Sequence, residues 1–352
     1  MASAVLFFFN SASSVSPPTA IVIRLIPLSI VFISDTAAHC RDGSPVKRYV
    51  LRASHKRNLA CFLAEIKARI RHKISVHCAS FCSTMIQSSF VLLKGIGECT
   101  ERRLWEDGIA DWRTFLARTA LPGISPGRKQ AYDLDIATAM HHLQTWQSRY
   151  FSHCLKPRDH WRLFEAFKAG AVYLDIETTG KPPLHGEVTV VGLYANGRMI
   201  SLVQGDSLSE ERLNAELAQH SLIVTFFGSI FDLPYLRAKF PGLITDLPHF
   251  DLCFAAKRLG LSGGLKRIES EVGIQRSADL QGLDGWEAVR LWNTWRHHGQ
   301  TAALDLLLRY NEADVRNLEP LATLIYDQLQ TRYGPALPPP AAGRHDAHGA
   351  AL

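Results

Sequence analysis

The stretch that most constrains the fold is "AVYLDIETTG" (171–180), in which an apolar run leads directly into two acids. Its first part, Ala171 to Leu174, has the composition of a short buried strand. Alternate side chains of a strand share a face, so Asp175 and Glu177 would point to one side and Ile176 to the opposite layer. Two carboxylates on one face repel each other unless a cation lies between them. The stretch therefore fits a metal site, and equally an acidic strand end in solvent.

The charge of the chain is unevenly distributed. Residues 1–84 carry 11 Lys and Arg against 3 Asp and Glu, which leaves 28 and 30 for residues 85–352. Because the main body is close to neutral, a nucleic-acid partner must be argued from local patches. The seven cysteines are dispersed without metal-type spacing. This pattern predicts a cytoplasmic protein without a disulfide partner.

The N-terminal segment has no clear domain character. Its apolar run at 20–33 is interrupted by Arg24 and Pro27 and is too short for a membrane-spanning helix, so we expect no membrane partner. The Ser-rich, Arg-rich and acid-poor composition resembles an organelle transit peptide. We favour a misplaced start instead, because the sequence changes from patternless to periodic at Met85. Residues 1–84 are thus expected to be a non-native or disordered extension.

The body divides into a helical region (85–167), a mixed α/β region (168–330) and a Pro-, Ala- and Gly-rich tail (331–352) that we expect to be disordered. In the helical region, a Gly95-Ile-Gly97 turn precedes a helix that should open near Thr100. Such turns expose backbone N–H groups suited to a phosphate oxygen. The pattern resembles a helix-hairpin-helix module, although a simple helix-capping turn would look the same.

The mixed region has the layout of a ribonuclease H-like α/β fold, a mixed sheet flanked by helices. After the acid-bearing strand, an Asn-Gly turn joins two apolar runs in "EVTVVGLYANGRMISLV" (187–203), which predicts a hairpin. A helix in "SEERLNAELAQH", a strand "LIVTFF" and a short strand in "LPHFDL" follow. Helices are then expected over 253–260 and 265–272, and in the long amphipathic segment that begins "TAALDLLLRY".

Two further acids stand where more metal ligands are needed. Asp232 follows the strand "LIVTFF" at the mouth of a helix, and Asp314 lies four residues after Tyr310, so that their side chains share a helix face. Divalent cations such as Mg²⁺ or Mn²⁺ take oxygen ligands, and two of them can stabilise the attacking and leaving oxygens of phosphodiester cleavage. Taken singly, Asp232 could be a helix cap and Asp314 a solvated acid paired with Arg316.

The order of these residues resembles a known pattern. Asp-x-Glu at 175 and 177, Phe-Asp at 231 and 232, and Tyr-x-x-x-Asp at 310 to 314 look like the three motifs of the DEDD exonuclease superfamily, in its tyrosine-bearing branch. The longer strings "YLDIETTG", "VTFFGSIFDLPYL" and "YNEADVRNLEPL" are similar to YprB-type ribonuclease H-like proteins, a family of predicted nucleases. The likeness covers about residues 168–325.

This resemblance implies a role for each of the five catalytic residues. Asp175 would bridge two divalent metal ions, Mg²⁺ or Mn²⁺, Glu177 and Asp314 would complete the first site, and Asp232 would help to hold the second. Tyr310 would orient the attacking water through its hydroxyl. The four acids are therefore the expected metal ligands.

One position departs from the family pattern. The second motif usually has Asn five residues before its Asp, and here that residue is Phe227. Phe can only pack or stack where Asn would form hydrogen bonds, so the departure bears on substrate preference and does not remove a metal ligand.

Basic residues gather after the acid-bearing strands, around 257–259, 265–268, 276, 290 and 296. Such residues could hold a nucleic-acid substrate, because contacts to backbone phosphates supply most of the affinity. Solvated helix faces would have the same composition. Trp286, Trp292 and Trp295 have near-helical spacing, which is more typical of core residues than of base-stacking platforms. The residues expected to contact nucleic acid are Gly95, Gly97, Thr178, Lys266 and Arg267.

The sequence thus predicts a metal-dependent phosphodiesterase that acts on DNA or RNA, as a 3′-to-5′ exonuclease with a two-metal mechanism. Two alternatives remain open. The chain could be a nucleic-acid-binding protein of the same fold with little catalysis, or a structure-specific endonuclease. The sequence indicates no oligomeric state.

Overall fold

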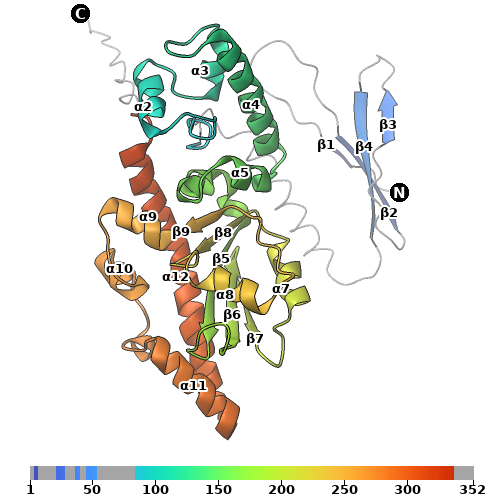
Figure 1. Ribbon diagram of the computed structural model, residues 1–352. Coiled ribbons are helices and arrows are strands. Elements are labelled where there is room, and N and C mark those ends of the chain that lie inside the picture. The colour runs from blue at the N-terminus through green and yellow to red at the C-terminus, as the bar shows by residue number, and fades with distance from the viewer. Residues whose placement is uncertain (1–3, 7–20, 28–35, 40–44, 54–83, 337–352) are drawn as a thin grey trace, which may run out of the picture. The chain divides into compact units, whose positions relative to one another are not determined.

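The computed structural model describes residues 4–6, 21–27, 36–39, 45–53 and 84–336 (Figure 1). The chain divides into two compact units, Met1–Cys82 and Ser83–Leu352. In the first unit, one sheet has the strand order β1-β2-β4-β3 and comprises β1 (Ala4–Leu6), β2 (Ile21–Pro27), β3 (Thr36–His39) and β4 (Pro45–Ala53). The predicted character of residues 1–84 falls mostly outside the described residues and stays a prediction.

The second unit begins with the expected helical region. Its elements are α2 (Glu98–Glu106), α3 (Trp112–Ala117), α4 (Pro126–Gln144), α5 (Ser148–Cys154), η1 (Pro157–Leu163), α6 (Phe164–Phe167) and η2 (Lys168–Gly170). A buried ion pair joins two parts of this region, because the carboxylate of Glu101 lies 2.9 Å from the guanidinium of Arg162 and both side chains are 1% exposed.

The Gly-Ile-Gly turn lies where the sequence places it, and α2 begins at Glu98, two residues before Thr100. Gly97 precedes the helix with an extended backbone, and Gly95 has a φ of 86°, a left-handed conformation that glycine adopts without strain. A Cβ on Gly95 would come within 2.5 Å of the Arg128 guanidinium. The turn is therefore packed against α4. The helix-hairpin-helix assignment stays a prediction.

The mixed region forms a five-stranded sheet with the order β7-β6-β5-β8-β9. Strands β5, β6 and β7 are antiparallel, while β8 lies parallel to β5 and β9 lies parallel to β8. The predicted hairpin is confirmed, since Asn196 and Gly197 at the β6–β7 turn have φ angles of 51° and 79°. The strands are β5 (Ala171–Thr178), β6 (Val188–Ala195), β7 (Arg198–Val203), β8 (Leu222–Thr225) and β9 (His249–Asp251).

The two faces of the sheet pack against different helices. Alternation along β5 sends Val172, Leu174 and Ile176 into a core with α7 and α8, while Ala171 and Tyr173 face the core that includes α12. The predicted mixed sheet flanked by helices is thus confirmed. The helices of this region are α7 (Glu210–Leu217), α8 (Asp232–Lys239), α9 (Leu252–Leu259), α10 (Leu265–Glu271), α11 (Gly285–His298) and α12 (Thr301–Tyr333), with a short turn η3 (Ala278–Leu280).

The long helix α12 positions much of the site. It crosses the sheet and packs on β5, β6, α9 and α11 (Figure 1). Its end at Tyr333 places residues 331–333 of the predicted tail in a helix, and residues 337–352 lie outside the described part.

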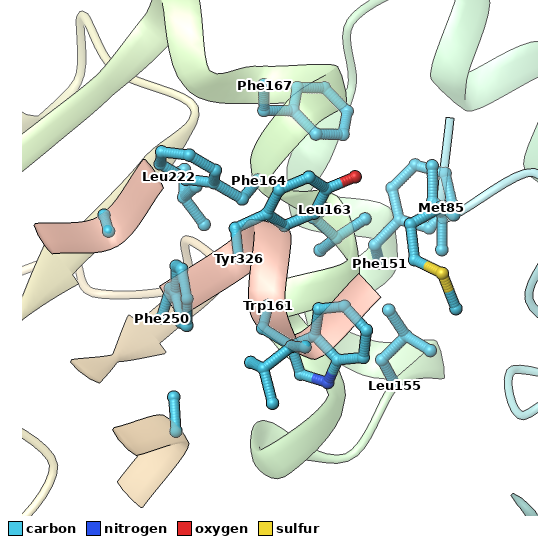
Figure 2. Close-up of a cluster of buried hydrophobic side chains, with 14 of the residues drawn as sticks. Met85, Phe151, Leu155, Trp161, Leu163, Phe164, Phe167, Leu222, Phe250 and Tyr326 are labelled. Carbon is cyan, nitrogen blue, oxygen red and sulfur yellow. The ribbon is translucent and has the colours of Figure 1, made fainter. Parts of the chain in front are cut away.

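One apolar core joins the helical front to the sheet. Figure 2 shows Met85, Phe151 and Phe164 of the front beside Phe250 of β9 and Tyr326 of α12. The rings of Phe164 and Phe250 have centroids 5.6 Å apart, and those of Phe164 and Tyr326 are 5.5 Å apart. Aromatic pairs at these distances stabilise the packing beyond the area they bury. The helical front, one face of the sheet and α12 therefore share one core.

Candidate metal centre and active site

Three of the predicted ligands converge. Asp175 and Glu177 come from β5 and Asp314 from α12, and each offers a carboxylate oxygen within 4.8 Å of the other two. Glu177 and Asp314 are 8% and 7% exposed, whereas Asp175 is partly exposed. The alternation in β5 brings the first two acids to one face, and α12 crosses that face. The structure thus brings these three acids together, and their role as metal ligands stays a prediction.

Asp232 lies beside this cluster on another element. It is the first residue of α8, is 2% exposed, and its Oδ1 accepts a hydrogen bond of 3.1 Å from the backbone N–H of Ile176. This bond anchors the start of α8 to β5 between the two strand acids. The simple helix-cap alternative does not describe Asp232, because the N-cap of α8 is Phe231 and the Asp232 carboxylate is buried and bonded to β5.

Burial and crowding raise the pKa of every acid in the group. The pKa of Asp175 lies well above its usual range because of burial, with further increases from the charges of Asp232, Asp314 and Glu177. Burial also raises the pKa of Glu177 and of Asp314, and it raises that of Asp232 to about 7. Four ionised carboxylates in this position would repel one another, and a bound cation would offset that repulsion.

The donor set fits a hard divalent cation. All the converging side chains offer carboxylate oxygens, the ligands that Mg²⁺ and Mn²⁺ prefer. No sulfur or imidazole ligand belongs to this group in the part of the chain that the structure describes. The geometry defines one group of three ligands, and the number of ions it holds stays a prediction.

Asn311 is a polar contact of the site that the sequence did not indicate. It is fully buried on α12, and its amide donates a hydrogen bond of 2.9 Å to Oδ2 of Asp175. The close approach depends on Gly192 of β6, since a Cβ there would lie 2.1 Å from Oδ1 of Asn311. A lone Asn next to a Tyr-x-x-x-Asp pattern carries no signal of this role in the sequence.

Tyr310 and Lys266 form a second contact of the site. Tyr310 is 5% exposed, and its hydroxyl accepts a hydrogen bond of 2.8 Å from Nζ of Lys266. The ammonium also lies 4.4 Å from the centre of the tyrosine ring and donates to the backbone carbonyl of Leu283. Burial raises the pKa of Tyr310, and the charges of Asp314 and Glu177 raise it further.

Arg276 has a different role from the one proposed for it. The sequence placed it among the basic residues that hold substrate, with a solvated face as the alternative. Its side chain is instead only 7% exposed, forms an ion pair with Asp314, and lies 2.6 Å from Glu269. Asp314 is thus paired with Arg276 from a distant loop, and the Arg316 alternative is wrong, because Arg316 pairs with Glu312.

The acids open into a pocket of about 480 Å³. Asp175, Glu177 and Asp314 line it together with Tyr310, and two aromatic side chains stand among its walls, Phe231 and Trp286. These aromatics are 43% and 72% exposed. The expectation that the tryptophans of α11 are core residues is correct for Trp292, which is 3% exposed, and wrong for Trp286.

Phe227 lies on the loop that follows β8. Its φ is 67°, a left-handed conformation that Asn adopts more readily than Phe. Its backbone N–H donates to Oδ1 of Asp251, whose Oδ2 accepts from Ser229, so one carboxylate orders the turn. The Phe227 ring is 39% exposed and stacks on Phe254, with centroids 6.0 Å apart. The side chain of Phe227 therefore contributes an aromatic surface, whereas an Asn side chain could form hydrogen bonds.

The remaining predicted nucleic-acid contacts lie in three places. Thr178 is buried at the pocket, and its hydroxyl accepts from the N–H of Gly180. Arg267 is exposed on α10. Gly95 and Gly97 belong to the turn before α2. Their contact with nucleic acid stays a prediction. None of the described helices has the length and apolar content to cross a bilayer.

Comparison with known families agrees with this architecture. Residues 172–326 match the family model of the RNase H superfamily. The mixed five-stranded sheet flanked by helices is the ribonuclease H-like α/β fold. No curated protein matches the sequence.

Several solved structures are similar to the chain. A family B DNA polymerase from the archaeon Pyrobaculum calidifontis matches 44% of this chain and 24% of its own, at 18% identity and a TM-score of 0.38. The NrnC protein of Brucella melitensis matches 47% of this chain and 77% of its own, at 23% identity and a TM-score of 0.34. The same protein with bound Mg²⁺ has 20% identity and a TM-score of 0.26, over 47% of this chain and 86% of its own. The chain thus spans about a quarter of the polymerase's length.

Proposed function

We propose that this protein is a metal-dependent nucleic-acid phosphodiesterase and that it acts as a 3′-to-5′ exonuclease. The observation that carries the proposal is the convergence of Asp175, Glu177 and Asp314 within 4.8 Å, from two elements far apart in sequence. Charge repulsion and burial make such a group costly for a purely structural purpose. A catalytic metal centre gives a physical reason for it.

Each side chain has a proposed task. Asp175, whose charge interacts with those of the other three acids, would help to hold both divalent ions. Glu177 and Asp314 would complete the ligands of one ion, and Asp232 would help to hold the other. When bound, the divalent ions activate water and stabilise the charge that develops on the attacking and leaving oxygens. The chain's own contribution is to bring the carboxylates together, and a bound cation would favour their ionised form.

The pocket walls favour a flexible strand end as substrate. Exposed aromatic rings at Phe231 and Trp286 flank the acids, and stacking on such rings is tolerant of base identity. A pocket of about 480 Å³ suits a terminal nucleotide better than a duplex. Both features fit an exonuclease that removes nucleotides one at a time.

Cleavage of end-labelled strands tests the proposal. The full chain is incubated with 5′-labelled single-stranded DNA and RNA in Mg²⁺, Mn²⁺ or EDTA, beside an Asp175→Asn/Asp314→Asn variant. We expect a metal-dependent ladder that shortens from the 3′ end and is absent from the variant. A 3′-terminal phosphorothioate should stop the reaction at its first step if it is exonucleolytic.

The other outcomes separate the alternatives. Cleavage of circular single strands, which have no end, would contradict exonuclease activity and show that the protein is an endonuclease. Binding of either strand without cleavage in any metal would overturn the enzyme assignment and leave a nucleic-acid-binding protein.

A further inference from the structure

The contact between Lys266 and Tyr310 crosses three elements. Lys266 lies on α10, its Nζ donates 2.8 Å to the hydroxyl of Tyr310 on α12, and it donates a second bond to the carbonyl of Leu283, just before α11. The sequence pattern had assigned Lys266 to nucleic-acid contact. Its ammonium donates to Tyr310, a residue of the proposed active site.

The direction of this hydrogen bond is fixed by chemistry. A lysine ammonium has three donors and no acceptor, so Lys266 donates and the oxygen of Tyr310 accepts. Burial lowers the pKa of the Lys266 ammonium, and the charges of Asp314 and Glu177 oppose this effect. One lone pair of the tyrosine oxygen is occupied by the Lys266 hydrogen bond from the α10 side.

The remaining sites of that hydroxyl must face elsewhere. A phenol oxygen has two lone pairs and one proton, so one lone pair and the proton are left for other partners. Tyr310 lines the pocket beside Asp175, Glu177 and Asp314. Without Lys266, the O–H would be free to rotate within the ring plane between two orientations of similar energy.

We infer that Lys266 is a positioning residue, which holds the Tyr310 hydroxyl in the one orientation that presents its free lone pair and its proton to the reacting water. This inference rests on the proposed function for its catalytic consequence. The contact itself is independent of any activity. Lys266 therefore acts through Tyr310, and contact with the substrate phosphate is the competing role.

A double-mutant cycle distinguishes these roles. Removing an orienting contact lowers kcat, and we expect Lys266→Met to reduce kcat by about tenfold or more while KM stays within about twofold. In a Tyr310→Phe background the same change should cost nothing further, because the hydroxyl that it orients is gone. Lys266→Arg, which keeps a cationic donor, should recover part of the loss.

The matched control is Arg309→Met. Arg309 immediately precedes Tyr310 on α12, is exposed, and pairs with Asp279. The substitution removes one positive charge beside Tyr310 in sequence without removing a bond to its hydroxyl, so kcat should stay at the wild-type value. Equal Mn²⁺ affinity and equal melting temperature in wild type and Lys266→Met would exclude a fault in the metal centre or the fold.

Three results would overturn the inference. They are an equal loss in both backgrounds, a higher KM with unchanged kcat, and wild-type kinetics in Lys266→Met. The second would assign Lys266 to the substrate phosphate instead.

A spectroscopic measurement separates this inference from the proposed function. In the metal-free full chain labelled with ¹⁵N-lysine, a hydrogen-bonded ammonium exchanges slowly enough to give a signal, identified by its loss in Lys266→Met. We expect Tyr310→Phe to shift or broaden that signal. A signal unaffected by Tyr310→Phe would refute the contact, whether or not the wild-type protein cleaves nucleic acid.

Discussion

The amide of Asn311 donates a hydrogen bond of 2.9 Å to Oδ2 of Asp175, across 136 residues of sequence. Asn311 is fully buried, and it follows Tyr310 directly on α12. A neutral donor in this place orients the carboxylate and favours its ionised form while adding no charge to the ligand group. The central acid of the site is therefore held by the same helix that supplies Tyr310 and Asp314.

Replacing this donor should weaken the metal centre. We expect Asn311→Leu to lower Mn²⁺ affinity by about 10- to 100-fold, the range seen when partners of metal ligands are removed. Calorimetric titration measures the affinity directly. Asn214→Leu is a control, because Asn214 is half-buried on α7 and its side chain bonds only to the backbone of Gly242 and Ile244. Equal affinity in Asn311→Leu and wild type would show that the contact is irrelevant to the metal.

The approach of α12 to β6 requires a glycine. A Cβ on Gly192 would lie 2.1 Å from Oδ1 of Asn311 and 2.7 Å from Val315. We predict that Gly192→Ala destabilises the fold by about 1–3 kcal/mol, as overpacking does, measured by urea unfolding. Gly127→Ala in the first turn of α4 meets no atom within 4 Å and should be neutral or slightly stabilising. Similar values for the two variants would contradict the packing argument.

The positions of site residues that follow from local sequence patterns could be predicted. Alternation along β5 indicated that Asp175 and Glu177 share a face, and helical spacing indicated the same for Tyr310 and Asp314. The order of strands and helices indicated the sheet, and its antiparallel hairpin followed from Asn-Gly. Each of these signals has a period or a turn preference that is written in neighbouring residues.

The parts set by the segment between α10 and α11 could not be predicted. This segment brings Arg276 to Asp314, and the flanking helices α10 and α11 bring Lys266 to Tyr310 and Trp286 to the pocket wall. Their neighbours in sequence are polar and irregular, so the same residues fit a solvated or nucleic-acid-binding surface. Only the path of the chain over α12 decides that Arg276 is buried and Trp286 exposed.

The ionisation of Asp232 should make metal-free stability depend on pH. Burial raises the pKa of Asp232 from 3.8 to about 7. The contribution of the protonated carboxyl to the free energy of unfolding is therefore complete below pH 3.8 and is lost as the pH rises through 7. Asp232→Asn cannot ionise and should gain stability over wild type between pH 4 and 8, on the order of 4 kcal/mol.

Urea unfolding in EDTA at several pH values measures this difference. Saturating Mn²⁺ at pH 8 should reduce or reverse the advantage of the variant, since binding needs the ionised carboxylate. A difference that stays constant from pH 4 to 8 would contradict the raised pKa.

The buried ion pair of Arg276 should matter more for stability than an exposed one. Its partners Glu269 and Asp314 would be left without a counter-charge in Arg276→Met, which we expect to cost about 3–5 kcal/mol. Arg316→Met is the matched control, because Arg316 is 44% exposed beside Glu312 and should cost less than about 1 kcal/mol. Unfolding curves of both variants measure the loss in the free energy of unfolding. Equal losses would show that burial does not strengthen the Arg276 ion pairs.

The most direct test of the metal centre is a Mn²⁺ titration of the full chain followed by electron paramagnetic resonance. Free Mn²⁺ gives a strong signal that binding removes, so the titration counts the ions held. We expect saturable binding to the wild-type protein, abolished or weakened at least 100-fold in Asp175→Asn, with circular dichroism unchanged. Binding to Asp175→Asn with the wild-type number and affinity would show that the acids converging on Asp175 do not form a metal site.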